Sequence, residues 1–403
     1  MTSDWKTYTV QELIDAGMLE EPLDGNHGNI HPKTSDYVAT GVPFIMANNL
    51  INGKVDYENC AFITGEQAGT LRKGFAKPGD VLLTHKATIG RTAIVDDEYE
   101  TIILTPQVTY YRVKNGISNR YLKYYFDSAP FQKLFSNWAG SGSTRAYLGI
   151  MAQRKLPIVL PPYETQLKIA NCCGAFDDKI YINQKINNNL YEQAKAIFAD
   201  RFLNMEAIPS GWKKGNLLDI ANYLNGLAMQ KFRPKAGEVG LPVLKIKELR
   251  QGSCDATSEL CSPNIKNEYI INDGDVIFSW SGSLLVDVWC GGICGLNQHL
   301  FKVTSENYDK WFYYMWTAHH LDRFVAIAAD KATTMGHIKR EELAKAEVII
   351  PSETDYRRIN SVMKPIFDMI ISNRIECRKL ADLRDELLPK LMSGEIDVTD
   401  IQF

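Results

Sequence analysis

Residues 164–202 are ETQLKIANCCGAFDDKIYINQKINNNLYEQAKAIFADRF, and this stretch decides the fold. Between Ile169 and Ile197, apolar and small residues recur at alternating intervals of four and three. This spacing is typical of a helix that packs through one seam of a coiled coil. The sequence therefore predicts one long helix of about 36 residues, roughly 50 Å at 1.5 Å per residue.

A second stretch, residues 359–391, has the same spacing. The two seams superpose at a separation of 190 residues, which aligns Asn183 with Asn373. A polar residue in a seam lowers stability but can fix register and pairing. The alternative is that Asn183 lies on the solvated flank of its helix. The predicted seam includes Ile180, Asn183, Leu190, Ile370, Asn373 and Leu380.

Local signals mark the weak points and ends of these helices. Gly174 lowers helix propensity in the first, and Pro365 predicts a kink at a similar place in the second. Ser352 and Asp355 have the spacing of a capping box, and Gly394 is a predicted stop.

The rest of the chain is duplicated too. The separation between matching positions falls from 207 residues for Trp5 and Trp212 to 190 for Thr144 and Thr334. Chance similarity would not keep the order, whereas two diverged copies with deletions in the second would. Between these ends lie Gly41-Val-Pro43 with Gly240-Leu-Pro242, Gly79-Asp-Val81 with Gly274-Asp-Val276, and Gln107 with Gln298.

Each copy begins with a module of short strands, turns and amphipathic helices. Strands are predicted at 81–84, 108–113, 158–160 and 276–279, and helices at 120–138 and 310–328. The predicted fold class is mixed α/β (α+β). We place module 1 at 1–162, the first long helix at 163–203, module 2 at 204–350, the second long helix at 351–394 and a tail at 395–403.

This order predicts a particular assembly. If the two helices pair antiparallel as a coiled coil, they separate two globular modules that are related by a pseudo-twofold axis. A helix of roughly 50 Å spans about 15 base pairs of DNA. Two modules at that separation would contact two short half-sites, and their different sequences predict different half-sites.

Several motifs resemble the specificity subunit of Type I restriction–modification systems, over essentially the whole chain. They are the paired Gly-Asp-Val turns, Thr84-His-Lys-Ala-Thr-Ile-Gly-Arg91, Gly142-Ser-Thr144, and Pro161-Pro-Tyr-Glu-Thr-Gln166 leading into Ile180-Tyr-Ile-Asn-Gln-Lys-Ile186. The second copy departs from them, with Pro351-Ser-Glu-Thr-Asp355 at the helix entry and Leu284-Leu-Val286 in place of Thr88-Ile-Gly90.

The resemblance implies a division of labour. The modules would be target-recognition domains for double-stranded DNA, and the long helices would be spacers that dock methyltransferase subunits, two of them. S-adenosylmethionine, ATP and Mg²⁺ would be held by these subunits and by a motor–nuclease (restriction) subunit. This chain itself would hold no cofactor and catalyse no reaction.

Composition and motifs agree with a non-catalytic protein. Among 403 residues there is no apolar run long enough to span a membrane, and the scattered eight cysteines suit the cytoplasm. No phosphate-binding loop is present. Leu160-Pro-Pro-Tyr163 lacks the acceptor side chain of an amino-methyltransferase motif, and no cysteine or histidine group has metal-ligand spacing. The net charge of −3 predicts either a basic face or basic partner subunits.

Base reading in the major groove needs Arg, Lys, Asn or Gln, and phosphate contacts need basic and hydroxyl side chains on loops. In module 1 these criteria select Asn48, Asn49, His85, Lys86, Thr88, Arg91, Ser141, Ser143, Thr144 and Arg145. In module 2 they select Lys245, Lys247, Ser279, Ser281, Lys331, Thr333, Thr334 and His337.

Two other functions compete with DNA reading. A bivalent protein-binding scaffold would suit the slightly acidic composition, and salt-dependent DNA binding would distinguish it from a DNA reader. An enzyme with an unfamiliar active site is the other alternative, which the search for catalytic motifs does not favour.

Overall fold

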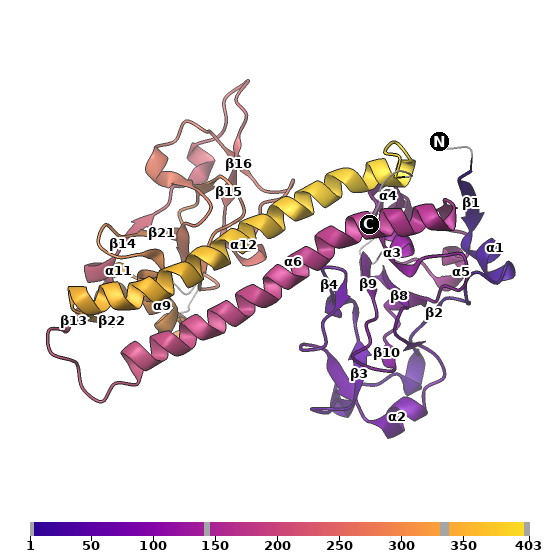
Figure 1. The fold of residues 1–403 in the computed structure, drawn as a ribbon, viewed down its shortest axis with the longest axis horizontal. Helices are drawn as coiled ribbons and strands as arrows, with labels where there is room; N and C mark the ends of the chain where they lie inside the picture. Colours follow the sequence, from indigo (N-terminus) through magenta and orange to yellow (C-terminus); the bar gives the residue numbers. More distant parts are fainter. Residues whose placement is uncertain (1–3, 141–145, 331–337, 399–403) are drawn as a thin grey trace. The chain divides into compact units, whose positions relative to one another are not determined.

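The structure is a computed structural model that describes residues 4–140, 146–330 and 338–398. It divides into two units. Unit 1 holds residues 1–178 and 382–403, and unit 2 holds residues 179–381. Module 1 therefore lies in unit 1 and module 2 in unit 2, while both long helices, α6 (Tyr163–Phe198) and α12 (Glu353–Ser393), contribute to both units (Figure 1).

Module 1 has two four-stranded sheets, ordered β2-β11-β8-β9 and β6-β3-β10-β7, and a sheet that pairs β1 with β12. A short hairpin joins β4 (Leu50–Ile51) to β5 (Lys54–Val55). The other strands are β1 (Lys6–Thr9), β2 (Leu23–Asp24), β3 (Val42–Ile45), β6 (Ala61–Ile63), β7 (Phe75–Ala76), β8 (Val81–Lys86), β9 (Thr88–Ile94), β10 (Ile102–Leu104), β11 (Val108–Tyr111) and β12 (Pro157–Leu160).

Module 2 repeats this plan. Its sheets are ordered β14-β21-β18-β19, β16-β15-β20-β17 and β13-β22, strand for strand the order of module 1. The mixed fold and the internal repeat predicted from the sequence are therefore confirmed. The strands are β13 (Lys213–Asn216), β14 (Asn222–Asn225), β15 (Leu241–Leu244), β16 (Leu260–Cys261), β17 (Ile270–Ile271), β18 (Val276–Ser279), β19 (Leu285–Val288), β20 (Cys294–Leu296), β21 (Leu300–Thr304) and β22 (Glu347–Ile350).

The Gly-Asp-Val turns that precede β8 and β18 have the same geometry. Gly79 and Gly274 have φ of 88° and 85°, a left-handed conformation that favours glycine. In each turn the aspartate accepts a backbone N–H three residues earlier, at 2.8 Å for Asp80 and 2.9 Å for Asp275. The predicted match between these turns is confirmed.

Strand register corrects one predicted match. Val108 pairs with Thr84 in module 1, and Leu300 pairs with Ser279 in module 2. The residue before Val108 is Gln107, so its counterpart is His299 rather than Gln298. The match of Gln107 with Gln298 was wrong by one position, because two identical residues do not reveal how their strands pair.

The helices predicted at residues 120–138 and 310–328 are each divided into two helices. In module 1, α3 (Asn119–Asp127) and α4 (Ala129–Trp138) meet at Ser128, whose backbone is extended with ψ of 139°. In module 2, α9 (Lys310–His319) and α10 (Leu321–Asp330) meet at His320. The shorter helices are α1 (Val10–Asp15), α2 (Gly65–Gly69), α5 (Ile150–Gln153), α7 (Leu217–Ile220), α8 (Ile246–Gln251) and α11 (Arg340–Ala344).

The predicted long helices are confirmed, and the structure adds one detail to each. A π-helix (Ala199–Leu203) continues α6, and α12 runs without interruption through Pro365. Ser352 caps α12 as predicted, because its hydroxyl accepts the Asp355 N–H at 3.2 Å. Gly394 follows the last helical residue with φ of 71°.

Each unit packs the start of one long helix with the end of the other. In unit 1 the core includes Ile169 and Cys173 of α6 with Leu388 and Leu391 of α12. The core of unit 2 includes the end of α6 and the beginning of α12, through Ala194, Phe198, Ile359 and Met363. The two helices are therefore antiparallel within each unit.

Candidate nucleic-acid interface

The β8–β9 hairpin ends in an exposed tip that carries three of the predicted DNA-contacting residues. Lys86, Thr88 and Arg91 are exposed, and the turn passes through Ala87 with φ of 64°. A non-glycine residue in the left-handed region is strained, and such strain gathers at functional sites. Among the described residues, the Lys86 ammonium lies 5.9 Å from the centroid of the Tyr147 ring.

Two other segments lie beside this hairpin. The Arg91 guanidinium donates to the carbonyl of Ala47 at 3.5 Å, which places it next to the exposed Asn48. On the other side, the Ala87 N–H donates to the carbonyl of Ala146 at 3.0 Å. The structure thus brings Asn48, Lys86, Thr88 and Arg91 to one edge of module 1.

For Asn49 and His85 the structure corrects the prediction that they contact DNA. Asn49 is 2% exposed, its Oδ1 accepts the Met46 N–H at 2.9 Å, and its Nδ2 donates to Asn59 at 3.1 Å. His85 is fully buried with its Nδ1 3.1 Å from the carbonyl of Leu148. Both side chains are buried behind this edge of module 1, where they bind backbone groups and have no surface that DNA could contact.

Burial also sets the charge of His85. It lowers the pKa of His85 to about 4, although the nearby Asp24 carboxylate opposes the shift. The imidazole is therefore neutral near pH 7 and adds no positive charge to the edge.

Module 2 presents a different edge. Ser279 and Ser281 are buried, and the Ser279 hydroxyl donates to the carbonyl of Ser283 at 2.9 Å, so these two predictions are also corrected. Lys247 is exposed and Lys245 is half-buried, and both are paired with acids. Lys245 lies 2.5 Å from Glu259, and Lys247 lies 3.2 Å from Asp255.

The remaining predicted residues lie outside the described part of the chain. These are Ser141, Ser143, Thr144, Arg145, Lys331, Thr333, Thr334 and His337. The segments that follow them are in equivalent places in the two modules, since the Leu148 N–H donates to the carbonyl of His85 and the Ile338 N–H to that of Trp280, at 3.0 and 2.9 Å.

The sequence did not reveal the residues that support the two edges. In module 1 the buried Asp24 pairs with His27 at 3.0 Å and with Lys73. In module 2 the Trp280 Nε1 donates to Asn225 at 3.0 Å. A signal was available: Gly25 and Gly226, which follow Asp24 and Asn225, occupy matching positions where any Cβ would collide with a strand carbonyl.

The predicted polar seam is confirmed in unit 2. Asn183 is 1% exposed and donates to Glu376 at 2.6 Å, which excludes the solvated flank. Asn373 donates to Asn187 at 2.9 Å, and Asn187 donates to the carbonyl of Ile370 at 3.2 Å. We call Asn183, Asn187, Asn373 and Glu376 the polar ladder. Ile180, Leu190, Ile370 and Leu380 are half-buried beside it.

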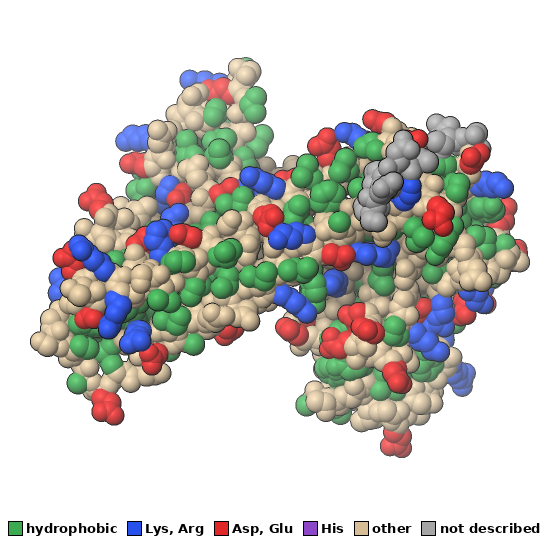
Figure 2. Space-filling view, in the orientation of Figure 1, with side chains coloured by type: hydrophobic (Ala, Val, Ile, Leu, Met, Phe, Trp, Pro, Cys, Tyr) green, Lys and Arg blue, Asp and Glu red, His purple; other side chains and the backbone are tan. Residues whose placement is uncertain are grey.

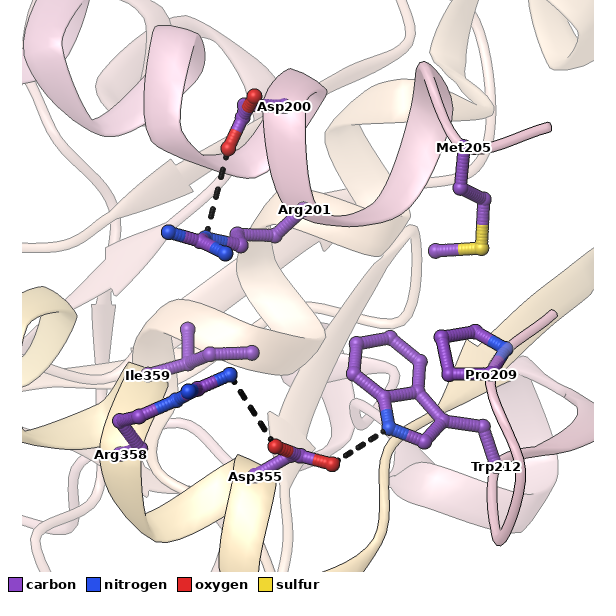
Figure 3. Close-up of a pocket in the computed structure, with 8 residues that line it drawn as sticks. All are labelled: Asp200, Arg201, Met205, Pro209, Trp212, Asp355, Arg358 and Ile359. Carbon is purple, nitrogen blue, oxygen red and sulfur yellow. Dashed lines mark hydrogen bonds and ion pairs between the residues drawn. The ribbon is translucent and has the colours of Figure 1, made fainter. Parts of the chain in front are cut away.

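A cavity of about 190 Å³ lies in unit 2, where the π-helix after α6 meets the first turns of α12 (Figure 3). Trp212 donates through Nε1 to Asp355 at 2.9 Å, and Arg358 lies 3.2 Å from the same carboxylate. Arg201 pairs with Asp200 at 3.4 Å. Each ion pair lies within one helix, and the Trp212–Asp355 hydrogen bond joins the first turn of α12 to the segment that follows the π-helix.

The described residues were also compared with the requirements of a metal site and of a membrane-spanning helix. No three or more His, Cys, Asp or Glu side chains are placed there to hold a metal ion. No helix among them is both long and apolar enough to cross a bilayer. On the face shown in Figure 2, basic side chains are interspersed with acidic ones instead of forming one continuous patch.

Known proteins are similar to this chain in sequence and in fold. The MjaIX Type I restriction enzyme specificity subunit of Methanocaldococcus jannaschii is 26% identical over 432 residues, covering 98% of this chain and 95% of the relative. The HindI specificity subunit of Haemophilus influenzae is 20% identical, covering 98% and 100%. The S subunit of a Type I restriction–modification system from M. genitalium has the same fold, with a TM-score of 0.56 at 14% identity over 97% of both chains.

The family model described as Type I restriction modification DNA specificity domain matches residues 2–192 and 209–377, one match for each copy of the repeat. Most of the chain is thereby covered. The chain belongs to this family, and it is a DNA sequence-specificity subunit.

Proposed function

We propose that this chain recognises a bipartite, asymmetric DNA target, one short block per module, and directs methyltransferase and restriction subunits to it. The observation that carries this proposal is the duplicated strand order with different side chains at the equivalent edges. A shared backbone gives two similar binding elements, and different edges give them different sequences to read. Lys86 and Arg91 of module 1 supply the exposed cations that phosphate and guanine attract.

The chain acts without chemistry of its own, in the cytoplasm. Methyltransferase subunits, two of them, dock on α6 and α12 and bring S-adenosylmethionine. The restriction subunit brings ATP hydrolysis with Mg²⁺ and cleavage. With a net charge of −3, the chain alone binds DNA weakly, and the complex binds more tightly because its partners add basic surface.

The test is to co-express the chain with the methyltransferase subunit of its own system and to map adenine methylation in the host genome by single-molecule sequencing. We expect a new motif of two short blocks around a fixed gap. Lys86→Ala should change or relax one block only. Lys77→Ala is the matched control, because Lys77 is exposed in the turn at the other end of β8. An active methyltransferase whose pattern ignores this chain would favour the scaffold function.

A further inference from the structure

Backbone contacts fix Tyr147 against the hairpin tip of module 1. Its N–H donates to the carbonyl of Ala139 at 3.1 Å, and the next residue, Leu148, donates to His85 at 3.0 Å. Tyr147 also forms an antiparallel bridge with Lys86. The residue therefore acts as a short additional strand, and its position does not depend on the side chain.

The Tyr147 side chain is 50% exposed, in contact with a cation and an aromatic ring. The Lys86 ammonium lies 5.9 Å from the centroid of the tyrosine ring, within the range of a cation–π interaction. The His85 ring lies 5.7 Å away on the buried side. A tyrosine has few rotatable bonds, so a ring held in this way loses little entropy when it binds a ligand.

Only some groups of double-stranded DNA are suitable contacts for the Tyr147 ring. In a stacked duplex, the base edges in the major groove display donors, acceptors and one apolar group, the C5 methyl of thymine. Lys86 can bind a guanine edge or a phosphate, whereas the tyrosine ring matches the methyl group.

We propose that Tyr147 is a specificity-determining residue of module 1 that contacts the C5 methyl of a thymine. This inference rests on the proposed function, because it requires the hairpin tip to face DNA. It assigns a role that the sequence criteria could not find, since they selected only polar and charged side chains.

The test uses uracil, which is thymine without the C5 methyl. Duplexes that carry both mapped blocks, with each thymine replaced in turn by uracil, are titrated with the complex of this chain and its methyltransferase subunit. One replacement in the block read by module 1 should weaken binding about fourfold, the value of one buried methyl group. The same replacement should have no effect on complexes with Tyr147→Ala or Tyr147→Gln, and should retain its effect with Tyr147→Phe.

Replacements in the other block serve as the internal control, because all four proteins should respond to them alike. The glutamine variant keeps the inference testable if the alanine variant misfolds. An undiminished uracil effect in both ring-free variants would overturn the inference, as would a module 1 block without any A·T pair. A failure of the proposed function looks different, since methylation would then ignore Lys86→Ala and the chain itself.

Discussion

The two modules build the same position below the hairpin tip with different chemistry. In module 1 the buried Asp24 faces the imidazole Nε2 of the buried His85 at 3.9 Å, too far for a hydrogen bond. In module 2 the equivalent pair is Asn225 and Trp280, joined by a hydrogen bond of 3.0 Å. Module 1 therefore has a titratable, charged support where module 2 has a neutral, aromatic one.

The difference shows how the edge of a module can diverge while the fold stays constant. The backbone bonds from Leu148 to His85 and from Ile338 to Trp280 are the same in both modules and do not depend on these side chains. Strand order and register are fixed by such bonds and by the cores. Side chains at the edge can then change without loss of the fold.

The units also differ in how a module is joined to the long helices. In unit 1, Asp177 of α6 accepts hydrogen bonds from Lys123 at 3.2 Å, Tyr124 at 2.6 Å and Arg384. In unit 2, two arginines of α12 form bidentate pairs, Arg374 with Asp287 and Arg378 with Asp273, at 2.7 to 2.8 Å. The Asp177 carboxylate thus accepts from three donors, whereas Asp287 and Asp273 each pair with one arginine.

The largest expected effect comes from Asp177→Ala. Burial alone would raise the pKa of Asp177, but Lys123, Tyr124 and Arg384 lower it, so the carboxylate is ionised. Its removal leaves Lys123, 7% exposed, without one of its two partners. We expect a loss of about 3 kcal/mol, the lower end for breaking a buried ion pair.

Urea unfolding, followed by hydrogen exchange of each module, measures this loss. Exchange should accelerate in module 1 and stay nearly constant in module 2. Asp178→Ala is the control, because Asp178 is 59% exposed and its pair with Arg120 is worth less than about 1 kcal/mol. Equal acceleration in both modules would show that Asp177 does not act locally.

Acidification should also distinguish the modules. The pKa of His85 is about 4 in the folded state, below the unfolded value of about 6.5. The unfolded chain therefore binds more protons between these values. The contribution of His85 to stability is complete above about pH 6.5 and falls by up to about 3 kcal/mol as the pH drops to about 4.

His85→Asn isolates this contribution, because the other histidines titrate in both proteins. The wild type should lose more module 1 stability than the variant between pH 7 and 4, measured by hydrogen exchange. Asp24, Lys86 and His27 are the charged or titratable groups that act on His85, and Asp24 opposes the shift. Parallel pH profiles of the two proteins would contradict the assignment.

The polar ladder of unit 2 predicts a smaller loss of stability for Asn187→Ala. Asn187→Ala removes a donor to Ile370 and the acceptor for Asn373, which is 9% exposed. Leaving a buried amide without its partner costs about 1–2 kcal/mol. Asn188→Ala, at the exposed next position, is the matched control and should be near neutral in thermal unfolding. An equal loss in both variants would show that the contacts of Asn187 in the polar ladder do not account for the cost.

Gly174→Ala should have the smallest effect. A Cβ at residue 174 would lie 2.4 Å from the Arg120 guanidinium, so this side chain must move and its pair with Asp178 weakens. Alanine in turn gains about 1 kcal/mol of helix propensity over glycine. The two terms nearly cancel, and the free energy of unfolding should change by less than about 1 kcal/mol. A large loss would mean that Arg120 cannot move.

The sequence by itself determined the features that follow from local or periodic signals. The seam spacing identified both long helices, the Ser352 cap and Gly394 marked the limits of α12, and the order of matching motifs showed the repeat. Each of these depends on neighbours close in the chain or on a regular period, so composition and spacing suffice to find it.

Only the tertiary structure decided which polar residues are exposed. Asn49 has the same side chain as Asn48, and His85 met the same sequence criteria as Lys86, yet strands from distant parts of the chain bury Asn49 and His85. The pairing of Asp24 with Lys73, and the contact of Tyr147 with Lys86, likewise join segments far apart in sequence. Burial and partner choice depend on how strands pair, and one sequence does not display that pairing.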